Sequence, residues 1–360
     1  MEIGKKGVIF SFMALLAIGL VLFILIPQQS ELNLERTNII RTRVQIADDY
    51  VKAVHESYLP GMVYVTSYKT LTALAIYVGN GSFFQNKGNF TEIFKEVLLN
   101  GTIKGVNVNT KTKAGIFDKN LTGMLRDLQN ISNSSMIIET NFNFDYNSTK
   151  VDIFQANETL GQTMGPWQVA VNVTFNYSII TEAARWNRTD SIVVIFSIEG
   201  LPDPLYLGST KGNFSNIIVK TNLSNFTLSD FQTFVNKSQY VYEAKSTSYL
   251  RRFYNDTSLP SDDCCGIESF VRDEVDNYFK PWPQGDPGQG GEINQSFVDC
   301  NFFGGRCVKD DLSVPLASYY INGITNNTYR FKIDQYRAFA KYNIPNCAPD
   351  SPGGMSGTCN

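Results

Sequence analysis

Near the start of the chain stands an uncharged run, Val8-Ile-Phe-Ser-Phe-Met-Ala-Leu-Leu-Ala-Ile-Gly-Leu-Val-Leu-Phe-Ile-Leu-Ile26, and it decides how the other residues are organised. A helix rises about 1.5 Å per residue, so this run is about 28 Å long, close to the hydrocarbon thickness of a bilayer. Residues 1–27 are therefore predicted to be a short leader and a transmembrane helix, with the remaining chain on one side of a cell membrane.

The charges beside this run do not by themselves orient it. A cleaved secretory signal normally has a shorter apolar core and a small-residue cleavage site, and neither is present here. Basic residues flank both ends of the run, with Lys5 and Lys6 before it and Arg36, Arg41 and Arg43 after it. The count of basic residues is therefore ambiguous.

Asparagine sequons decide the orientation. The sequence holds 18 Asn-x-Ser/Thr motifs, more than this composition is expected to produce by chance, and none precedes residue 80. Each is an acceptor for a surface glycan outside the cell, so the N-terminus is predicted to be cytoplasmic and the bulk of the chain external. The sequon asparagines are Asn80, Asn89, Asn100, Asn120, Asn130, Asn133, Asn147, Asn157, Asn172, Asn176, Asn187, Asn213, Asn222, Asn225, Asn236, Asn255, Asn294 and Asn326.

The cysteines also indicate an oxidising compartment. All six fall in the last hundred residues, at Cys264, Cys265, Cys300, Cys307, Cys347 and Cys359. An even number of clustered cysteines on an exported chain predicts a disulfide framework, although six cysteines allow about 15 pairings. A bond between the neighbours Cys264 and Cys265 would be strained, so each is expected to reach a distant partner. A thiolate metal site is disfavoured because no Cys-x-x-Cys spacing occurs.

Composition argues against several kinds of chemistry. The net charge of −3 implies no polyanion partner, and no nucleic-acid binding is expected. His55 is the single histidine, which removes most histidine catalysis and most zinc sites. The sequence also lacks a Gly-rich phosphate loop and a Gly-x-Ser-x-Gly elbow. We therefore expect a protein that is not an enzyme and that carries neither a cofactor nor a metal.

Helical spacing continues beyond the membrane run. An apolar stripe with steps of three and four predicts a helix that ends at Pro60-Gly61. A second helix is predicted over 62–78, so residues 28–80 are expected to form a helical stalk or antiparallel helix hairpin. The stripe serves either packing within this part or a contact between subunits. Its members are Ile40, Val44, Ala47, Val51, Val54 and Tyr58 in the first helix, and Val65, Tyr68, Leu71 or Thr72, and Ala75 in the second.

Residues 81–255 are predicted to be a glycosylated α+β ectodomain with a mainly antiparallel sheet. Short helices are expected over 91–99, closed by Asn100-Gly101, and over 121–131. Strict alternation over 169–179 predicts a half-buried strand with Asn172 and Asn176 on its polar face. A more buried strand is expected over 191–199, with a helical turn over 182–187 before it. Further strand candidates are 136–146 and 216–221.

Residues 256–360 are predicted to be a loop-rich region that disulfides hold in place. Prolines and glycines over 281–291 exclude regular structure there. Strands are expected at 319–321 and 329–334, and the tail from Pro345 is expected to be a loop pinned by Cys347 and Cys359.

Two carboxylate features are candidate sites. In Gly200-Leu-Pro-Asp-Pro-Leu-Tyr206, two prolines around Asp203 fix a turn with Tyr206 close behind. A rigid strand exit is favoured there over a binding site. Asp262-Asp263 and Asp310-Asp311 flank the cysteines and could serve calcium or a glycosidase, but acidic loop pairs are usually only solvated.

Several short pieces together resemble a group of uncharacterised archaeal surface proteins with type IV pilin-like N-termini. The pieces are Lys5-Lys-Gly-Val-Ile-Phe-Ser-Phe12, Ser67-Tyr-Lys-Thr-Leu-Thr-Ala-Leu74, the Trp-x-Val-x-Val-x-Val pattern at Trp167, Leu201-Pro-Asp-Pro-Leu-Tyr206 and Gly266-Ile-Glu-Ser-Phe270. The resemblance implies archaeal export and a cell-surface location. It also implies prepilin-type (class III signal) processing between Gly7 and Val8, after which the helix would pack into a filament core. A plain uncleaved anchor is equally open.

The sequence therefore predicts a membrane-anchored, N-glycosylated surface protein with a structural or adhesive role, as a pilin-like subunit or a surface-binding protein. Its partners would be the membrane and, through the N-terminal helix, further copies or other surface proteins. One alternative is a secreted hydrolase that uses carboxylates. Another is a receptor module for a small ligand or glycan, with Trp167, Trp186, Trp282 or Tyr206 near its pocket.

Overall fold

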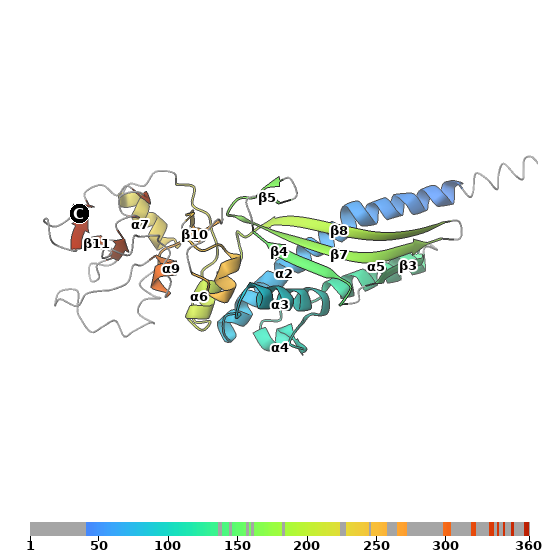
Figure 1. Cartoon of the computed structure of the whole chain (residues 1–360), viewed down its shortest axis with the longest axis horizontal. Helices are drawn as coiled ribbons and strands as arrows, with labels where there is room; N and C mark the ends of the chain where they lie inside the picture. Colours follow the sequence, from blue (N-terminus) through green and yellow to red (C-terminus); the bar gives the residue numbers. More distant parts are fainter. Residues whose placement is uncertain are drawn as a thin grey trace, which may run out of the picture. The chain divides into compact units, whose positions relative to one another are not determined.

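A computed structural model describes most of the chain after the first 40 residues (Figure 1). The described residues are 41–135, 139–143, 146–155, 158–159, 162–181, 184–223, 228–244, 246–257, 265–271, 298–303, 318–321, 331–334, 337, 341–342, 347–348 and 356–359. The predicted leader and transmembrane run lie outside them. Within these ranges no helix has the length and apolarity to cross a bilayer.

Helical structure runs without a break from residue 41 to Asn80, so the predicted helix hairpin is wrong. An α-helix over 41–53 leads into a π-helical turn, η1 Val54–Tyr58, and then into α2 Leu59–Asn80. In η1 the Leu59 N–H donates to the Val54 carbonyl, five residues back. Regular α-helical spacing would press the Pro60 ring against the carbonyl of Glu56, and the wider turn directly before Pro60 accommodates the ring. Pro60-Gly61 therefore does not end the helix.

The π turn also shifts the apolar stripe by one residue. Ala47, Val51 and Val54 are buried, as predicted, but Tyr58 is 50% exposed and Leu59 is buried in its place. In α2 the predicted stripe residues Leu71 and Ala75 are buried, but Val65 is exposed and Val63 is buried.

The remaining helices and strands alternate along the chain, and the fold is α+β with mainly antiparallel sheets, as predicted. The helices are α3 Lys87–Asn100, α4 Val108–Thr112, α5 Leu121–Ser135, α6 Pro204–Ser209, α7 Leu228–Asn236, η2 Leu250–Tyr254 (a 3₁₀ helix) and α9 Asp299–Phe302. The strands are β1 Thr102–Ile103, β2 Val106–Asn107, β3 Glu139–Asn143, β4 Lys150–Phe154, β5 Glu158–Thr159, β6 Gln162–Thr163, β7 Gln168–Ile180, β8 Arg185–Ser197, β9 Val241–Tyr242, β10 Ile267–Glu268, β11 Ser318–Ile321, β12 Phe331–Asp334, β13 Cys347–Ala348 and β14 Ser356–Cys359.

The helices predicted over 91–99 and 121–131 are confirmed as α3 and α5. Helix α3 begins earlier than predicted, and α5 ends later. In α3 the Asn86 side chain caps the first turn by accepting from the Asn89 N–H at 2.9 Å. Gly101 ends it in the left-handed region, φ +69°, with its N–H on the Val97 carbonyl. The second confirmed helix, α5, buries Leu121 and Leu125.

The long strand β7 is the middle of the largest sheet (Figure 1). It pairs with β3, β4 and β8, and its register against β4 runs antiparallel from Lys150↔Thr174 to Phe154↔Ala170. The predicted alternation is confirmed, because every second side chain from Val169 to Ile179 is buried. The strand β8 begins at Arg185, so the predicted helical turn over 182–187 is wrong. Thr181 N–H donates to the Ala184 carbonyl at 2.8 Å and closes the connection instead.

The later strands are predicted only in part. Both predicted strands near residues 320 and 331 are present as β11 and β12. The tail was expected to be a loop, but β13 and β14 pair antiparallel there, and β14 also pairs parallel with β11. The candidate strand over 216–221 is wrong, since it makes only single bridges, at Ile217 and Lys220.

The chain forms two compact units. The first takes its described residues from Met1–Leu59, Leu128–Asn143 and Tyr177–Arg188. The second comprises Pro60–Asp127, Phe144–Asn176 and Thr189–Asn360, and it contains every residue of the site described below.

Aromatic side chains form much of the core of the second unit. Phe270 lies 5.0 Å from Phe231, 5.6 Å from Phe234 and 5.4 Å from Tyr342, measured between ring centroids. All four rings are buried. Phe270 belongs to the segment 265–271, which also carries Glu268 and Ser269 of the candidate site.

Candidate functional site

The segment that follows β8 turns sharply and starts helix α6. Gly200 has a φ of +87°, which a residue with a side chain rarely adopts. Asp203 then caps α6, and its Oδ1 accepts the Leu205 N–H at 2.8 Å. Pro204 occupies the first helical position, where a missing N–H is tolerated. The two prolines thus fix a helix start whose capping carboxylate is fully buried.

Arg252 joins this cap to a second carboxylate. Its Nη1 lies 2.7 Å from Asp203 Oδ2 and 2.8 Å from Asp299 Oδ2, and all three side chains have zero exposure. Its Nη2 donates to the Ile267 carbonyl. One guanidinium therefore ties together α6, η2, β10 and α9.

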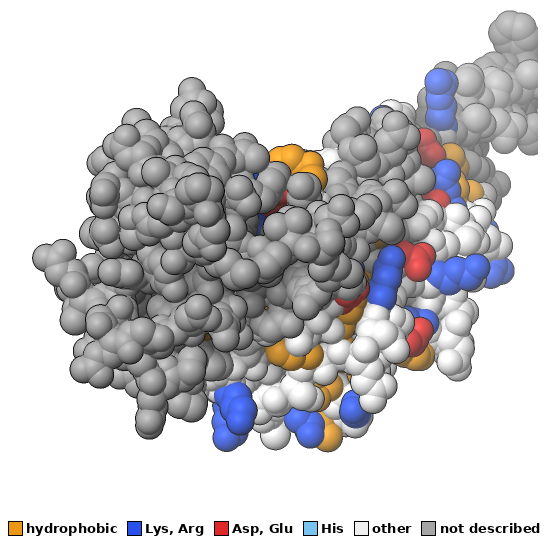
Figure 2. All heavy atoms as spheres, turned by 60° about the vertical axis from the view of Figure 1, so that its left-hand side comes forward, with side chains coloured by type: hydrophobic (Ala, Val, Ile, Leu, Met, Phe, Trp, Pro, Cys, Tyr) orange, Lys and Arg blue, Asp and Glu red, His pale blue; other side chains and the backbone are white. Residues whose placement is uncertain are grey.

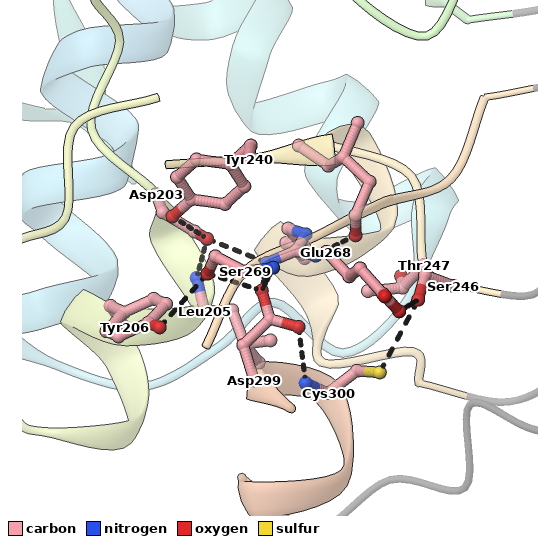
Figure 3. Close-up of polar contacts among 12 residues, drawn as sticks. Asp203, Leu205, Tyr206, Tyr240, Ser246, Thr247, Glu268, Ser269, Asp299 and Cys300 are labelled. Atoms are coloured by element: carbon pink, nitrogen blue, oxygen red, sulfur yellow. Dashed lines mark hydrogen bonds and ion pairs between the residues drawn. The ribbon is translucent and has the colours of Figure 1, made fainter. Parts of the chain in front are cut away.

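Hydrogen bonds surround both carboxylates (Figure 3). The Tyr240 hydroxyl donates to Asp203 Oδ2 at 2.7 Å. Asp299 Oδ2 accepts the N–H and the hydroxyl of Ser269, each at 3.0 Å, and Asp299 Oδ1 accepts the Cys300 N–H at 2.6 Å. We call this set the Arg252 network; its members are Asp203, Tyr206, Tyr240, Arg252, Ser269 and Asp299, with the Tyr206 hydroxyl 3.0 Å from Ser269 Oγ.

A second buried ion pair involves Glu268, the residue that follows Ile267 in β10. Arg337 Nε donates to Glu268 Oε2 at 2.7 Å, and the Tyr342 hydroxyl donates to Glu268 Oε1 at 2.6 Å. Ser246 Oγ also donates to Glu268 Oε2, at 2.9 Å. We call these four residues the Glu268 network. Both networks meet at the segment Ile267–Ser269.

Burial and ion pairing shift the pKa values of the buried ionisable groups in different directions. Burial raises the pKa of Asp299, and the attraction of Arg252 offsets this only in part. Burial alone would lower the pKa of Arg252, but Asp203 and Asp299 together raise it above its usual range. Burial also raises the pKa of Glu268, yet attraction to Arg337 and Lys341 and the Tyr342 hydrogen bond lower it overall.

The buried tyrosines are held neutral. Burial raises the pKa of Tyr206, Tyr240 and Tyr342 well above the usual value, with nearby carboxylates adding to the effect. Neutral hydroxyls donate to carboxylates, which is the role that Tyr240 and Tyr342 have here. Removing one partner of such a buried ion pair typically destabilises a protein by about 3–5 kcal/mol. The arrangement therefore holds chain segments together, and its charges face one another rather than solvent.

The two residues singled out in the proline turn both enter this network. Asp203 has zero exposure and Tyr206 has 2%. Of the tryptophans, Trp167 is half-buried under Lys220, whose Nζ lies 5.7 Å from the ring, and Trp186 is half-buried; Trp282 lies outside the described residues. Gly7 and Val8 also lie outside them.

The sequon asparagines lie at the surface wherever the structure describes them. Asn157, Asn225, Asn294 and Asn326 fall outside the described residues, and none of the other 14 is buried. Asn89, Asn120 and Asn172 are half-buried. The exposed ones are Asn80, Asn100, Asn130, Asn133, Asn147, Asn176, Asn187, Asn213, Asn222, Asn236 and Asn255.

Two of the cysteines are part of the segments that carry the networks. Cys265 and Cys300 are buried and disulfide-bonded. Cys300 follows Asp299 directly. Cys347 and Cys359 are opposite each other in the β13–β14 pair. Cys264 and Cys307 lie outside the described residues.

The described part of the chain holds no group of His, Cys, Asp and Glu side chains that could bind a metal ion. The acidic pairs Asp262-Asp263 and Asp310-Asp311, considered for calcium or for a glycosidase, lie outside it. His55 is part of η1 and is half-buried.

Sequence reasoning missed Arg252, Glu268, Asp299 and Arg337. A signal existed for two of them. Arg252 stands in the aromatic run Tyr249-Leu-Arg-Arg-Phe-Tyr254, and Glu268 stands between apolar residues in Gly266-Ile-Glu-Ser-Phe270. A charge within an apolar segment suggests a buried partner. The sequence does not identify that partner, since Arg252 is 49 residues from Asp203 and 47 from Asp299.

Comparison of the chain with protein-family models, curated proteins and solved structures gave no match.

Proposed function

We propose that this chain is a membrane-anchored, N-glycosylated cell-surface protein with a structural or adhesive role. The run Val8–Ile26 would cross the membrane, with the N-terminus in the cytoplasm and the described residues outside the cell. Disulfides would hold the C-terminal region, which is consistent with the bonded state of Cys265 and Cys300.

The observation that carries the proposal is the position of the sequons. A glycan can be accommodated only where the asparagine side chain reaches solvent. All 14 described sequon asparagines meet this requirement, including those inside helices and strands. In β7 the two sequons fall on the polar face of the strand, while its apolar face is buried.

The use of the buried charges also supports a structural role. Asp203, Asp299 and Glu268 are each paired with an arginine at zero side-chain exposure. A hydrolase needs carboxyl groups that reach a substrate, whereas these three groups reach only other segments of the same chain.

The described surface is mixed in character. On the described part of the face drawn in Figure 2, side chains of Lys and Arg and of Asp and Glu are interspersed, and hydrophobic side chains form small groups. Such a surface suits a soluble ectodomain on a membrane anchor.

Mass spectrometry of the protein from its native membrane tests the proposal. Glycopeptides at the exposed sequons, such as Asn147 and Asn176, are expected. A chain that carries no glycan at any sequon would contradict the proposed location.

The same sample decides between two forms of the proposal. A mature N-terminus at Val8 supports prepilin-type processing and a pilin-like subunit that assembles through its N-terminal helix. A start at Met1 supports a plain anchor and removes the pilin-like form.

A further inference from the structure

Strand β7 combines two sequons with pairing on both edges. Asn172 and Asn176 stand near its middle, in Asn172-Val-Thr174 and Asn176-Tyr-Ser178. In the antiparallel register, Asn172 is opposite Asp152 of β4 and Thr174 is opposite Lys150. The other edge of β7 is paired with β8. Both sequons are thus parts of a strand inside a sheet.

The finished sheet has room for glycans on these residues. Asn172 Oδ1 accepts the Ser191 hydroxyl and Asn176 Oδ1 accepts the Thr189 hydroxyl, each at 2.6 Å. These contacts use the side-chain oxygen, whereas a glycan is attached to the amide nitrogen Nδ2. The neighbouring side chains on this face, Thr174, Thr189 and Ser191, are polar and at least partly exposed. The modified asparagines therefore fit the folded state.

The reaction that transfers the glycan to asparagine does not fit the folded state. The amide nitrogen forms a bond to the anomeric carbon of a sugar carried on a lipid phosphate or diphosphate. The bond from that carbon to the phosphate oxygen breaks, the phosphate leaves with the electron pair, and an amide proton passes to a base of the transferase. For this the transferase must hold the asparagine and the hydroxyl two residues later in its own groove.

In the folded protein both recognition groups of the first sequon are occupied. Ser191 Oγ lies 3.0 Å from Thr174 Oγ1 and also bonds to Asn172. The backbone of the sequon is paired with β4. Access by a transferase would require β7 to leave the sheet, and inner strands open only with unfolding of the surrounding unit.

We infer that glycans reach Asn172 and Asn176 before β7 is enclosed by its partner strands, so that occupancy of these two sites records the order of modification and folding. The inference rests on the proposed glycosylation. Asn213 provides the contrast. Asn213 and the hydroxyl residue of its sequon, Ser215, are both exposed and lie outside any helix or strand, so this sequon can meet a transferase in the folded chain.

The expected difference is large. Only about 10⁻³ to 10⁻⁶ of a folded protein is unfolded at a given moment. Transfer to Asn172 and Asn176 in the folded chain should therefore be slower than transfer to Asn213 by a factor of about 10³ or more.

The test uses full-length chain made without glycosylation, either folded or unfolded in urea and then diluted. Each sample is added to membranes that contain the transferase and its lipid-linked sugar donor, and occupancy is followed by mass spectrometry. The folded chain is expected to gain a glycan at Asn213 but not at Asn172 or Asn176, and the unfolded chain at all three. Similar rates at the three sites of the folded chain would overturn the inference. No transfer to any site of the unfolded chain would overturn the proposed glycosylation as well.

Two variants separate strand pairing from side-chain contacts while both sequons stay intact. Ser191→Ala removes the hydroxyl that contacts Asn172 and Thr174, and transfer to the folded chain should stay slow. Val171→Ala weakens the buried side of β7, so the rate of transfer to Asn172 should rise by the same factor as the unfolded fraction, and the rate at Asn213 should stay unchanged. Fast transfer in the Ser191→Ala variant would show that the hydroxyl contact, not the sheet, blocks the site.

If the chain needs its glycans to fold, the order can be measured during synthesis. Pulse-labelled chain is translocated into membranes depleted of donor, and donor is restored at intervals. Asn172 and Asn176 are expected to lose their capacity to be modified as protease resistance appears, and Asn213 to keep it. If all three asparagines lose the capacity to accept a glycan at the same time, the inference is overturned.

Discussion

Two groups of hydrogen-bonded polar side chains in the second unit differ in their surroundings and in their charge. In the Arg252 network the ion pairs lie at zero exposure, whereas Asn172, Thr174 and Ser191 form a chain of uncharged contacts on the open face of β7 and β8. In water a lost partner is replaced by a water molecule, while in the core a lost partner leaves a charge with no compensation. The loss of one contact should therefore have very different effects on stability in the two places.

The largest effect is expected from Arg252→Met, which leaves Asp203 and Asp299 buried without their cation. The free energy of unfolding, measured in urea, should fall by about 3–5 kcal/mol. The matched control is Arg251→Met. Arg251 pairs with Asp256 at 2.8 Å, but this pair is partly exposed, so its loss should change stability by about 0–1 kcal/mol. Equal effects of the two variants would contradict the comparison.

A change of similar size that depends on pH is expected from Glu268→Gln. Although burial raises the pKa of Glu268, Arg337 and Lys341 outweigh it and lower the folded-state value below the usual 4.5. The ionised group therefore stabilises the fold above pH 4.5, and this contribution is lost as the pH falls through the lowered pKa. The variant should be less stable than the natural chain by about 3 kcal/mol at pH 7.

Urea titrations of both proteins between pH 3 and pH 7 test the sign. The difference in the free energy of unfolding between the two proteins should become smaller toward acidic pH, because the natural chain loses its own Glu268 contribution there. A gap that widens toward acid would show that the pKa of Glu268 is not lowered in the folded state.

A smaller loss of stability is expected from Asp203→Asn. Asparagine can still accept the Leu205 N–H and cap α6, and Asp299 still compensates Arg252. What is lost is the charge in the contacts from Arg252 and Tyr240, so stability should fall by about 1.5–3 kcal/mol. Asp203→Ala, which also removes the cap, should lose about 1 kcal/mol more. Equal thermal midpoints for the two variants would argue against the cap.

The smallest effect is expected on the open face. Ser191→Ala removes the contacts to Asn172 and Thr174, and cross-strand pairs of this kind contribute about 0.2–1 kcal/mol. Thermal unfolding should therefore change little. A loss as large as that of Arg252→Met would mean that exposure does not separate the two groups.

The parts of the fold that the sequence predicted are those with a local cause. The Gly101 end of α3 and the alternation along β7 depend on residues a few positions apart. The helix end at Pro60 was predicted by the same local rules and is wrong, because one added residue in the π turn accommodates the proline ring.

The candidate site could be predicted only in part. The proline turn identified Asp203 and Tyr206, since their positions follow from neighbouring residues. Their partners come from segments about 50 residues away, and Glu268 and Arg337 are separated by 69 residues. Which distant charges meet depends on how the segments pack, and nothing in the spacing of a single sequence specifies that.

The π turn at Val54–Tyr58 has a consequence for evolution. It holds one residue more than an α-helix needs, and the buried positions change phase there, from Val54 to Leu59. Deleting one residue from this turn would restore ordinary helical spacing while leaving both stretches of buried side chains in line. Homologues of this chain are therefore expected to tolerate a single-residue gap at this place, and to lack the proline wherever the gap occurs.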